Sequence, residues 1–151
     1  MDSTGATTGV QTVDVPISSV NKDHSIVIVT SNGSGSTPDK IYVSGQITSS
    51  TNISFKRGNG SYSTCSITWT VIEFNNVKSK QSGLTSTSAS GIDITLSSIN
   101  LNKSFANISF YHTATDQIPI SCQATLTTNS NLNLITKSNT AIISWEIIEF
   151  N

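Results

Sequence analysis

The sequence contains few charged residues and no long apolar run. Charged residues make up 11% of the 151 positions and the net charge is −1. The chain therefore lacks the basic surface that binding to a nucleic-acid backbone requires. The residues after Met1 do not form a charged-then-apolar secretory signal, and no apolar stretch is long enough to span a membrane. We expect neither a nucleic-acid partner, nor a membrane anchor, nor export by the ordinary secretory route.

Side chains that commonly bind metals or carry out catalysis are also scarce. His24 and His112 are the only histidines, and neither has a Cys, Asp or Glu at ligand spacing. The sequence groups no Ser, His and Asp as a catalytic triad. Gly58-Asn59-Gly60 lacks the Lys-Ser/Thr continuation of a phosphate-binding loop. We therefore predict no metal, no cofactor and no catalytic residues, and expect a protein that is not an enzyme.

The polar residues that are abundant, Ser, Thr and Asn, disfavour helices and favour strands joined by turns. Val13, Val15 and Ile17 alternate with polar residues, which is typical of a strand with one buried face. Pro16 cannot donate to a ladder and places this strand at a sheet edge. Strands are predicted at 12–20, 25–30, 41–47, 53–56, 65–75, 93–98, 104–111, 118–126, 132–136 and 141–150, and no helix is predicted.

One stretch of the sequence occurs twice. Residues 65–75, CSITWTVIEFN, are matched by residues 141–151, AIISWEIIEFN, and Trp69 and Trp145 are the only tryptophans. The offset is 145 − 69 = 76. A match of this kind over two aromatic positions and a glutamate indicates an internal repeat.

The repeat extends towards the amino terminus with small changes of offset. Residues 14–21 match 93–100 at an offset of 79, with Asp, Ser, Ser and Asn identical. A looser match joins 41–46 to 118–123 at an offset of 77. These matches predict an all-β protein made of two tandem, internally duplicated small antiparallel β-sandwich units. The expected division is a first repeat at 1–77, a Ser/Thr/Gly-rich linker at 78–91 and a second repeat at 92–151.

The repeated stretch also supplies the predicted core. We expect Trp69 and Trp145, together with Phe74 and Phe150, to fill the interior of the two halves. Each half alone is small, so the halves should pack on each other or on neighbouring chains.

Each half carries a glutamate between apolar residues, which must be exposed or paired. Glu73 is predicted to pair with Arg57 or Lys56, and Glu149 with Lys137, as possible buried ion pairs. Two isolated carboxylates, Asp14 and Asp93, are expected to bond locally at strand ends.

The two cysteines occupy unequal places in the repeat. Cys65 aligns with Ala141, and Cys122 aligns with Gly45 at the offset of 77. A disulfide retained through duplication would occupy matching places, so we predict buried free thiols.

Several motifs together resemble a known group of proteins. These are Asp-x-x-x-Ser-Ser-(Val/Ile)-Asn, the Phe-Lys-Arg-Gly turn at 55–58 and the closing Ile-x-Trp-x-Val-Ile-Glu-Phe strand. The pattern resembles repeats found in tailed-bacteriophage virion proteins. The strand layout is also similar to H-type lectin domains, six-stranded sandwiches that end in a Val-x-Trp strand and assemble as trimers or hexamers.

The resemblance to phage proteins implies a non-enzymatic virion structural protein. The expectation is a capsid decoration or auxiliary head protein, bound at symmetric positions on the virion surface after synthesis in the host cytoplasm. Its partners would be capsid or other virion proteins, and a homo-oligomer, with a trimer favoured, would be expected. The second half has Thr136-Lys137 where the first has Arg57-Gly58, so a site built on Arg57 would occur once in each chain.

The similarity to lectins implies an alternative, a glycan- or receptor-binding module of a tail or fibre. Aromatic rings exposed on loops would serve this role, because sugars stack on them. The candidate contacts are Tyr42, Tyr62 and Tyr111, with His112 beside the last. A third interpretation, a polysaccharide hydrolase, requires a pair of carboxylates at glycosidase separation.

Overall fold

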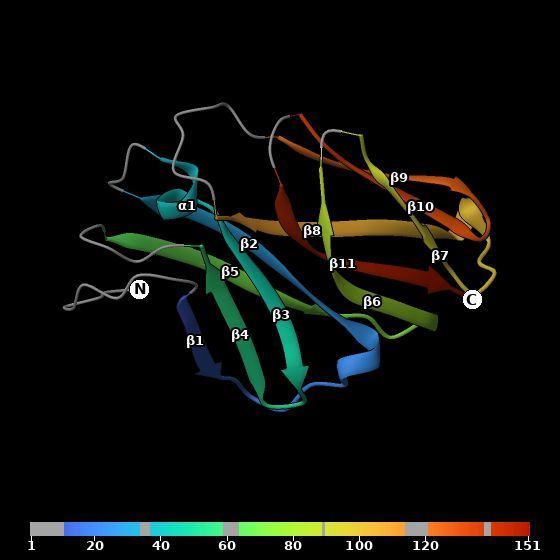
Figure 1. Ribbon diagram of the computed structural model, residues 1–151. Helices are drawn as coiled ribbons and strands as arrows, with labels where there is room; N and C mark the ends of the chain where they lie inside the picture. The colour runs from blue at the N-terminus through green and yellow to red at the C-terminus, as the bar shows by residue number, and fades with distance from the viewer. Residues whose placement is uncertain (1–10, 34–36, 59–63, 89, 114–120, 138–139) are drawn as a thin grey trace.

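The computed structural model describes residues 11–33, 37–58, 64–88, 90–113, 121–137 and 140–151, and it is built almost entirely of strands (Figure 1). The strands of the amino-terminal half are β1 (Gln11–Pro16), β2 (Ser25–Gly33), β3 (Val43–Ser49), β4 (Asn52–Arg57) and β5 (Cys65–Glu73). Those that follow are β6 (Val77–Thr87), β7 (Ile92–Thr95), β8 (Ser104–His112), β9 (Cys122–Thr128), β10 (Asn131–Thr136) and β11 (Ala141–Phe150). The short helical turns are η1 (Lys22–His24), α1 (Pro38–Ile41) and η2 (Leu101–Lys103).

The strands form four antiparallel sheets, arranged as two sandwich-like halves. In the first half, β1-β4-β3 covers the pair β2-β5; in the second, β7-β10-β9 covers β6-β11-β8. A separate apolar core lies within each half. The predicted all-β fold is confirmed, and each of the ten predicted strands overlaps an observed one. Pro16 lies in β1, an edge strand, as predicted.

Matched residues of the two halves make matching hydrogen bonds. Asn21 Oδ1 accepts from the Asp23 backbone N at 3.1 Å, and Asn100 Oδ1 accepts from that of Asn102 at 3.0 Å. The asparagine that ends the repeated Asp-x-x-x-Ser-Ser-x-Asn motif therefore caps a turn of 3₁₀ helix, since a short side-chain oxygen satisfies an otherwise unpaired N–H. Ser25 and Ser104 likewise donate to the carbonyl oxygens of these asparagines.

Strand pairing corrects one alignment made from the sequence. Val43 is paired with Arg57, and Cys122 is paired with Thr136 at the same place in the second half. The offset is 122 − 43 = 79, as it is for the first motif, so Cys122 corresponds to Val43 and not to Gly45. The looser match of 41–46 to 118–123 at an offset of 77 is therefore out of register with the strand pairing. Its first three residues in the second half, 118–120, lie outside the described residues.

Trp145 is a core residue, as predicted. Its side chain is 8% exposed and lies in the apolar cluster of the second half. The indole packs on Gly83 of β6 so closely that a Cβ there would lie 2.6 Å from the ring. The indole Nε1–H donates to Thr85 Oγ1 at 3.0 Å, which satisfies the polar end of this large ring.

The prediction that Trp69 is also a core residue is wrong. Trp69 is 36% exposed, although it touches Phe55 at a ring-centroid distance of 6.1 Å. The difference comes from the sheets, because β11 lies between β6 and β8, whereas β5 pairs with β2 alone among the described strands. The interpretation of residues 78–91 as a linker is also wrong, because residues 78–87 belong to β6, the strand that pairs with β11.

Phe74 and Phe150 do not occupy the two separate cores but meet each other. Their rings lie edge to face at a centroid distance of 5.3 Å, and both contact Phe105. All three are partly buried against a small cluster of Ile26, Val77 and Ile148. This cluster joins the halves near the ends of β5 and β11.

A buried ion pair of the second half also makes hydrogen bonds to the first half. Lys80 Nζ donates to Glu146 Oε1 at 2.8 Å, and the two side chains are 6% and 4% exposed. Glu146 Oε2 accepts from the Val27 backbone N at 3.1 Å and from Asn107 Nδ2 at 3.0 Å. Asn107 also donates to the Val27 carbonyl. Glu146 and Asn107 of the second half therefore bind the backbone N–H and C=O of Val27, on the edge of β2.

Two further contacts complete this junction. Ser109 Oγ accepts from the Gly45 backbone N at 3.0 Å and lies 3.3 Å from the Gly45 carbonyl, to which it donates. Lys80 Nζ also donates to the carbonyls of Lys22 and Ser25. Because backbone groups buried without partners are costly, these side chains allow the edges of β2 and β3 to be buried against the outer face of β8 and β11.

Candidate binding surfaces

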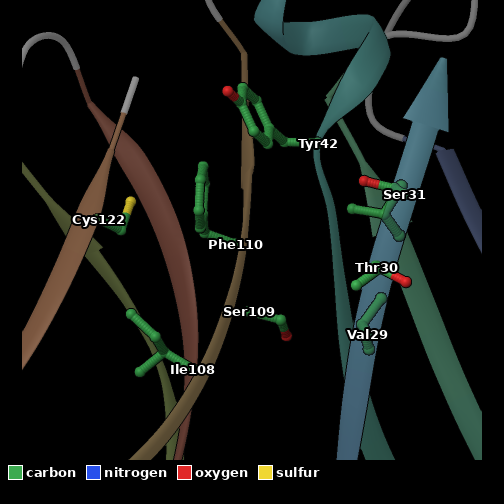
Figure 2. A pocket seen from close by; sticks show the side chains of 9 residues that line it. Val29, Thr30, Ser31, Tyr42, Ile108, Ser109, Phe110 and Cys122 are labelled. Carbon is green, nitrogen blue, oxygen red and sulfur yellow. The ribbon is translucent and has the colours of Figure 1, made fainter. Parts of the chain in front are cut away.

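A cavity of about 310 Å³ lies where the two halves meet (Figure 2). Figure 2 shows Phe110 and Cys122 on one side, the β2 residues Thr30 and Ser31 on the other, and the ring of Tyr42 between them. The Tyr42 and Phe110 rings are in contact, with centroids 4.7 Å apart. The cavity is lined by Val29, Thr30, Ser31, Tyr42, Val43, Ile108, Ser109, Phe110 and Cys122.

Local structure explains how these side chains reach the cavity. Tyr42 stands between α1 and the start of β3, where the chain turns into the sheet. Along β8 the side chains alternate, so Phe110 and Ile108 share one face while Ser109 lies on the other and bonds Gly45. The cavity thus combines an aromatic wall with serine and threonine hydroxyls, which suits a small polar ligand with one apolar face.

Of the contacts predicted from the sequence, Tyr42 lines this cavity, whereas Tyr111 and His112 do not. Tyr111 and His112 were predicted on an exposed loop, which is wrong: both are buried at the end of β8. Burial raises the pKa of the Tyr111 hydroxyl above its ordinary value. The strand β8 ends at His112, one residue beyond the strand predicted at 104–111. Tyr62 lies outside the described residues.

Cys122 places a thiol at the cavity, and neither cysteine forms a disulfide, as predicted. Cys65 is buried, whereas Cys122 is half-buried. Desolvation raises the pKa of the Cys122 thiol to about 12. A thiol that holds its proton at neutral pH is a poor nucleophile and a poor metal ligand, so Cys122 contributes shape and apolar surface to the cavity.

The two halves carry equivalent polar clusters on their exposed sheet faces. In the first half, Asn52 Nδ2 donates to Thr48 Oγ1 at 2.8 Å and to Asp14 Oδ1 at 3.3 Å. In the second, Asn131 Nδ2 donates to Thr127 Oγ1 at 2.7 Å and to Asp93 Oδ1 at 3.0 Å. We call these groups the Asp–Asn–Thr clusters.

Asp93 receives a further hydrogen bond from Asn133 at 2.8 Å. The hydrogen bonds from Asn131 and Asn133 lower the pKa of the Asp93 carboxyl below its ordinary value. The expectation that Asp14 and Asp93 bond locally at strand ends is wrong, because each accepts a hydrogen bond from an asparagine side chain of the neighbouring strand, far away in the sequence. Each cluster leaves carboxylate and hydroxyl oxygens at the surface, because its aspartate and threonine are exposed.

The predicted ion pairs are wrong in their partners. Arg57 is fully buried at the end of β4, where it donates to the Lys40 carbonyl at 3.3 Å and to Gln11 Oε1 at 2.9 Å. Glu73 lies at the opposite end of the first half and accepts from the Asn21 backbone N at 3.1 Å. Strand polarity separates Arg57 from Glu73, and the sequence alone did not show it.

In the second half, Glu149 is buried, as predicted, but its partner is Lys78 of β6 and not Lys137, which is exposed. Glu149 Oε1 accepts from Lys78 Nζ at 2.8 Å and from the Asn100 backbone N at 2.9 Å, and Oε2 accepts from Ser79. The hydrogen bond from Lys78, then that from Asn100, lowers the pKa of the Glu149 carboxyl despite its burial. Both glutamates therefore hold the asparagine that caps the 3₁₀ turn of their own half.

Sequence reasoning missed two features of the polar interior. Lys80 and Glu146 were not predicted to pair, although Glu146 interrupts an apolar strand, which is a signal for burial with a partner. Asp39 of α1 is fully buried near the end of β4, and neither carboxylate oxygen has a hydrogen-bond partner among the described residues. The helix α1 has only four residues, so the sequence shows no periodic pattern from which the burial of Asp39 can be predicted.

Within the described ranges, no three His, Cys, Asp or Glu side chains are grouped so that they could hold a metal ion. No helix in that part of the chain is long and apolar enough to cross a membrane. Comparisons with protein-family models, with curated proteins and with solved structures each found no match.

Proposed function

We propose that this protein is a non-enzymatic bacteriophage virion protein that decorates the capsid shell at symmetric positions. The observation that carries the proposal is the recurrence of the Asp–Asn–Thr cluster on both halves. A chain that presents the same hydrogen-bonding group twice is suited to bind a surface whose own subunits repeat. The motif pattern, which resembles tailed-phage virion repeats, supplies the identity of that surface.

The chemistry of the clusters fits protein–protein contact. Each offers oxygen acceptors held in place by an asparagine amide, and the chain has a net charge of only −1. Binding would depend on hydrogen bonds and shape more than on long-range charge, as in the polar rims of protein interfaces. Weak dependence on salt is therefore expected.

A binding assay with emptied phage particles tests this proposal. Thr48→Arg and Thr127→Arg place a bulky cation at each cluster, and Thr70→Arg, at an exposed threonine of β5, is the matched control. Each cluster variant should weaken cosedimentation with particles, the double variant should abolish it, and the control should bind normally. Unchanged binding by the double variant would contradict the role of the clusters.

A second candidate, a lectin-like module of a tail or fibre, is favoured by the cavity of Figure 2. Its aromatic wall of Tyr42 and Phe110, with the hydroxyls of Thr30 and Ser31 nearby, is the kind of site that accepts a sugar ring. The two functions separate when purified protein is incubated with host cells as well as with particles. Cell binding that free sugars inhibit and that Tyr42→Ala removes would favour the lectin over the decoration protein.

A further inference from the structure

An apolar groove runs along the open edge of β5. It has a volume of about 430 Å³ and is lined by Pro16, Ile17, Ser18, Val20, Trp69 and Val71. Trp69 forms part of its wall and is 36% exposed. Among the described strands β5 pairs only with β2, so its other edge presents backbone donors and acceptors beside a large aromatic ring. An edge of this kind is a site for the addition of another strand.

The corresponding groove of the second half is filled by β6. Leu96, Ile99, Trp145 and Ile147, the counterparts of Ile17, Val20, Trp69 and Val71, are between 1% and 8% exposed. β6 pairs with β11 along the edge that corresponds to the open edge of β5. Gly83 of β6 lies directly opposite Trp145.

Three residues of β6 show how the groove of the second half is occupied. Gly83 leaves room for the indole, since a Cβ there would lie 2.6 Å from it. Thr85, two residues later, accepts the indole N–H at 3.0 Å. Gln81 binds both backbone groups of Ser97, which occupies the position of Ser18, at 2.8 and 2.9 Å. The two contacts with the indole therefore call for an extended segment with a glycine, one spacer and a threonine, while the position of Gln81 is taken by Ser3 in the segment described next.

The chain contains such a segment directly before β1, as β6 stands directly before β7. Gly5-Ala6-Thr7 matches Gly83-Leu84-Thr85 at an offset of 78, one less than the 79 that relates the following strands. Residues 81–87 of β6 cover Ala141 to Ile147, and their counterparts at this offset are residues 3–9, so the segment has sufficient length.

We propose that residues 1–10, which lie outside the described residues, add as a strand to the open edge of β5 in the same chain. Gly5 then faces the Trp69 ring, and the Thr7 hydroxyl accepts its indole N–H. The addition gives the first half a three-stranded sheet like β6-β11-β8 and removes an edge that would otherwise pair with other chains. The proposal concerns a different surface from the Asp–Asn–Thr clusters and does not depend on them.

NMR of the full-length, ¹⁵N-labelled protein tests the proposal. The indole N–H of Trp69, assigned with Trp69→Phe, should exchange slowly with solvent and show nuclear Overhauser contacts to Thr7. Gly5→Val should speed this exchange by tenfold or more, because a side chain at Gly5 meets the ring. Ala6→Val is the matched control, since its counterpart Leu84 is 42% exposed and points away from Trp145.

The outcomes are distinct. An unchanged Trp145 indole signal in Gly5→Val shows that the variant is folded, so that faster exchange at Trp69 reports the loss of the added strand. Fast exchange at Trp69 in the wild-type protein, or equal effects of Gly5→Val and Ala6→Val, would overturn the proposal. Protection that disappears on dilution would overturn the same-chain form of it, because a second copy would then supply the strand.

Discussion

The strands β5 and β11 have nearly the same sequence but different surroundings, and the comparison shows how much of a residue's role is set by its neighbours. Both carry Trp, Glu and Phe at equal spacing. β11 is flanked on both edges and buried on both faces, while among the described strands β5 has one neighbour, which leaves its tryptophan 36% exposed. One strand, β6, accounts for much of the difference, since it covers Trp145, supplies Lys78 to Glu149 and supplies Lys80 to Glu146.

The largest effect is expected from truncating the two tryptophans. Trp145→Ala should lower the free energy of unfolding by about 3–5 kcal/mol, because it leaves a cavity beneath β6. In a chain that lacks residues 1–10, Trp69→Ala should cost about 1 kcal/mol, since the described strands leave that ring 36% exposed. Urea denaturation measures both. Equal losses in the full-length chain would show that the two rings are equally buried in solution, as the proposed addition of residues 1–10 to β5 requires.

The ion pair between Lys80 and Glu146 has no counterpart in the first half, where Thr70 stands at the position of Glu146 and is exposed. Lys80→Met leaves the Glu146 carboxylate buried without its cation and should destabilise the protein by about 3–5 kcal/mol. Removing both charges in Lys80→Met/Glu146→Leu should cost much less. A double variant as unstable as the single one would show that the hydrogen bonds to Val27 and Asn107, and not the charge balance, dominate.

Asn107 and Ile28 occupy the same position of the two halves and have opposite environments. Asn107 bonds Val27 and Glu146, whereas Ile28 is 43% exposed. Asn107→Ala leaves those buried groups short of a partner and should cost about 1–3 kcal/mol. Ile28→Asn should change stability by less than about 0.5 kcal/mol. Thermal melts of the two variants side by side provide the test, and a large loss for Ile28→Asn would contradict its assigned exposure.

The smallest effect concerns how the stability contributed by the Glu149 carboxyl depends on pH. The hydrogen bond from Lys78 lowers its pKa in the folded state, so this carboxyl adds stability above its unfolded pKa. That contribution is lost as pH falls through the lower, folded pKa. Carboxyl ¹³C NMR should show the depressed pKa and a rise in Lys78→Met, with Lys103→Met, at an exposed lysine, as the control. A pKa that Lys78→Met leaves unchanged would assign the effect to the Asn100 N–H.

The strands themselves were predictable, because their signals are local. Alternation at Val13, Val15 and Ile17 predicts β1, and the repeated stretch at 65–75 and 141–151 predicts β5 and β11. The strand β6 was missed because residues 78–87 are rich in Lys, Ser and Thr and contain few apolar residues to reveal a buried face. Of the candidate site residues, Tyr42 lines a cavity, while Tyr111 and His112 are buried, since nothing in the sequence marks where β8 ends.

The sequence by itself determined the class of the protein, the order of ten strands and the turns that Asn21 and Asn100 cap, because each depends on residues close together in the chain. The tertiary structure decided which edge of each sheet is covered and which partner each charge finds. Those outcomes join residues far apart, such as Lys80 with Glu146 and Glu149 with Lys78. Two strands with nearly the same residues therefore differ in burial, because burial is a property of what packs against a strand and not of the strand alone.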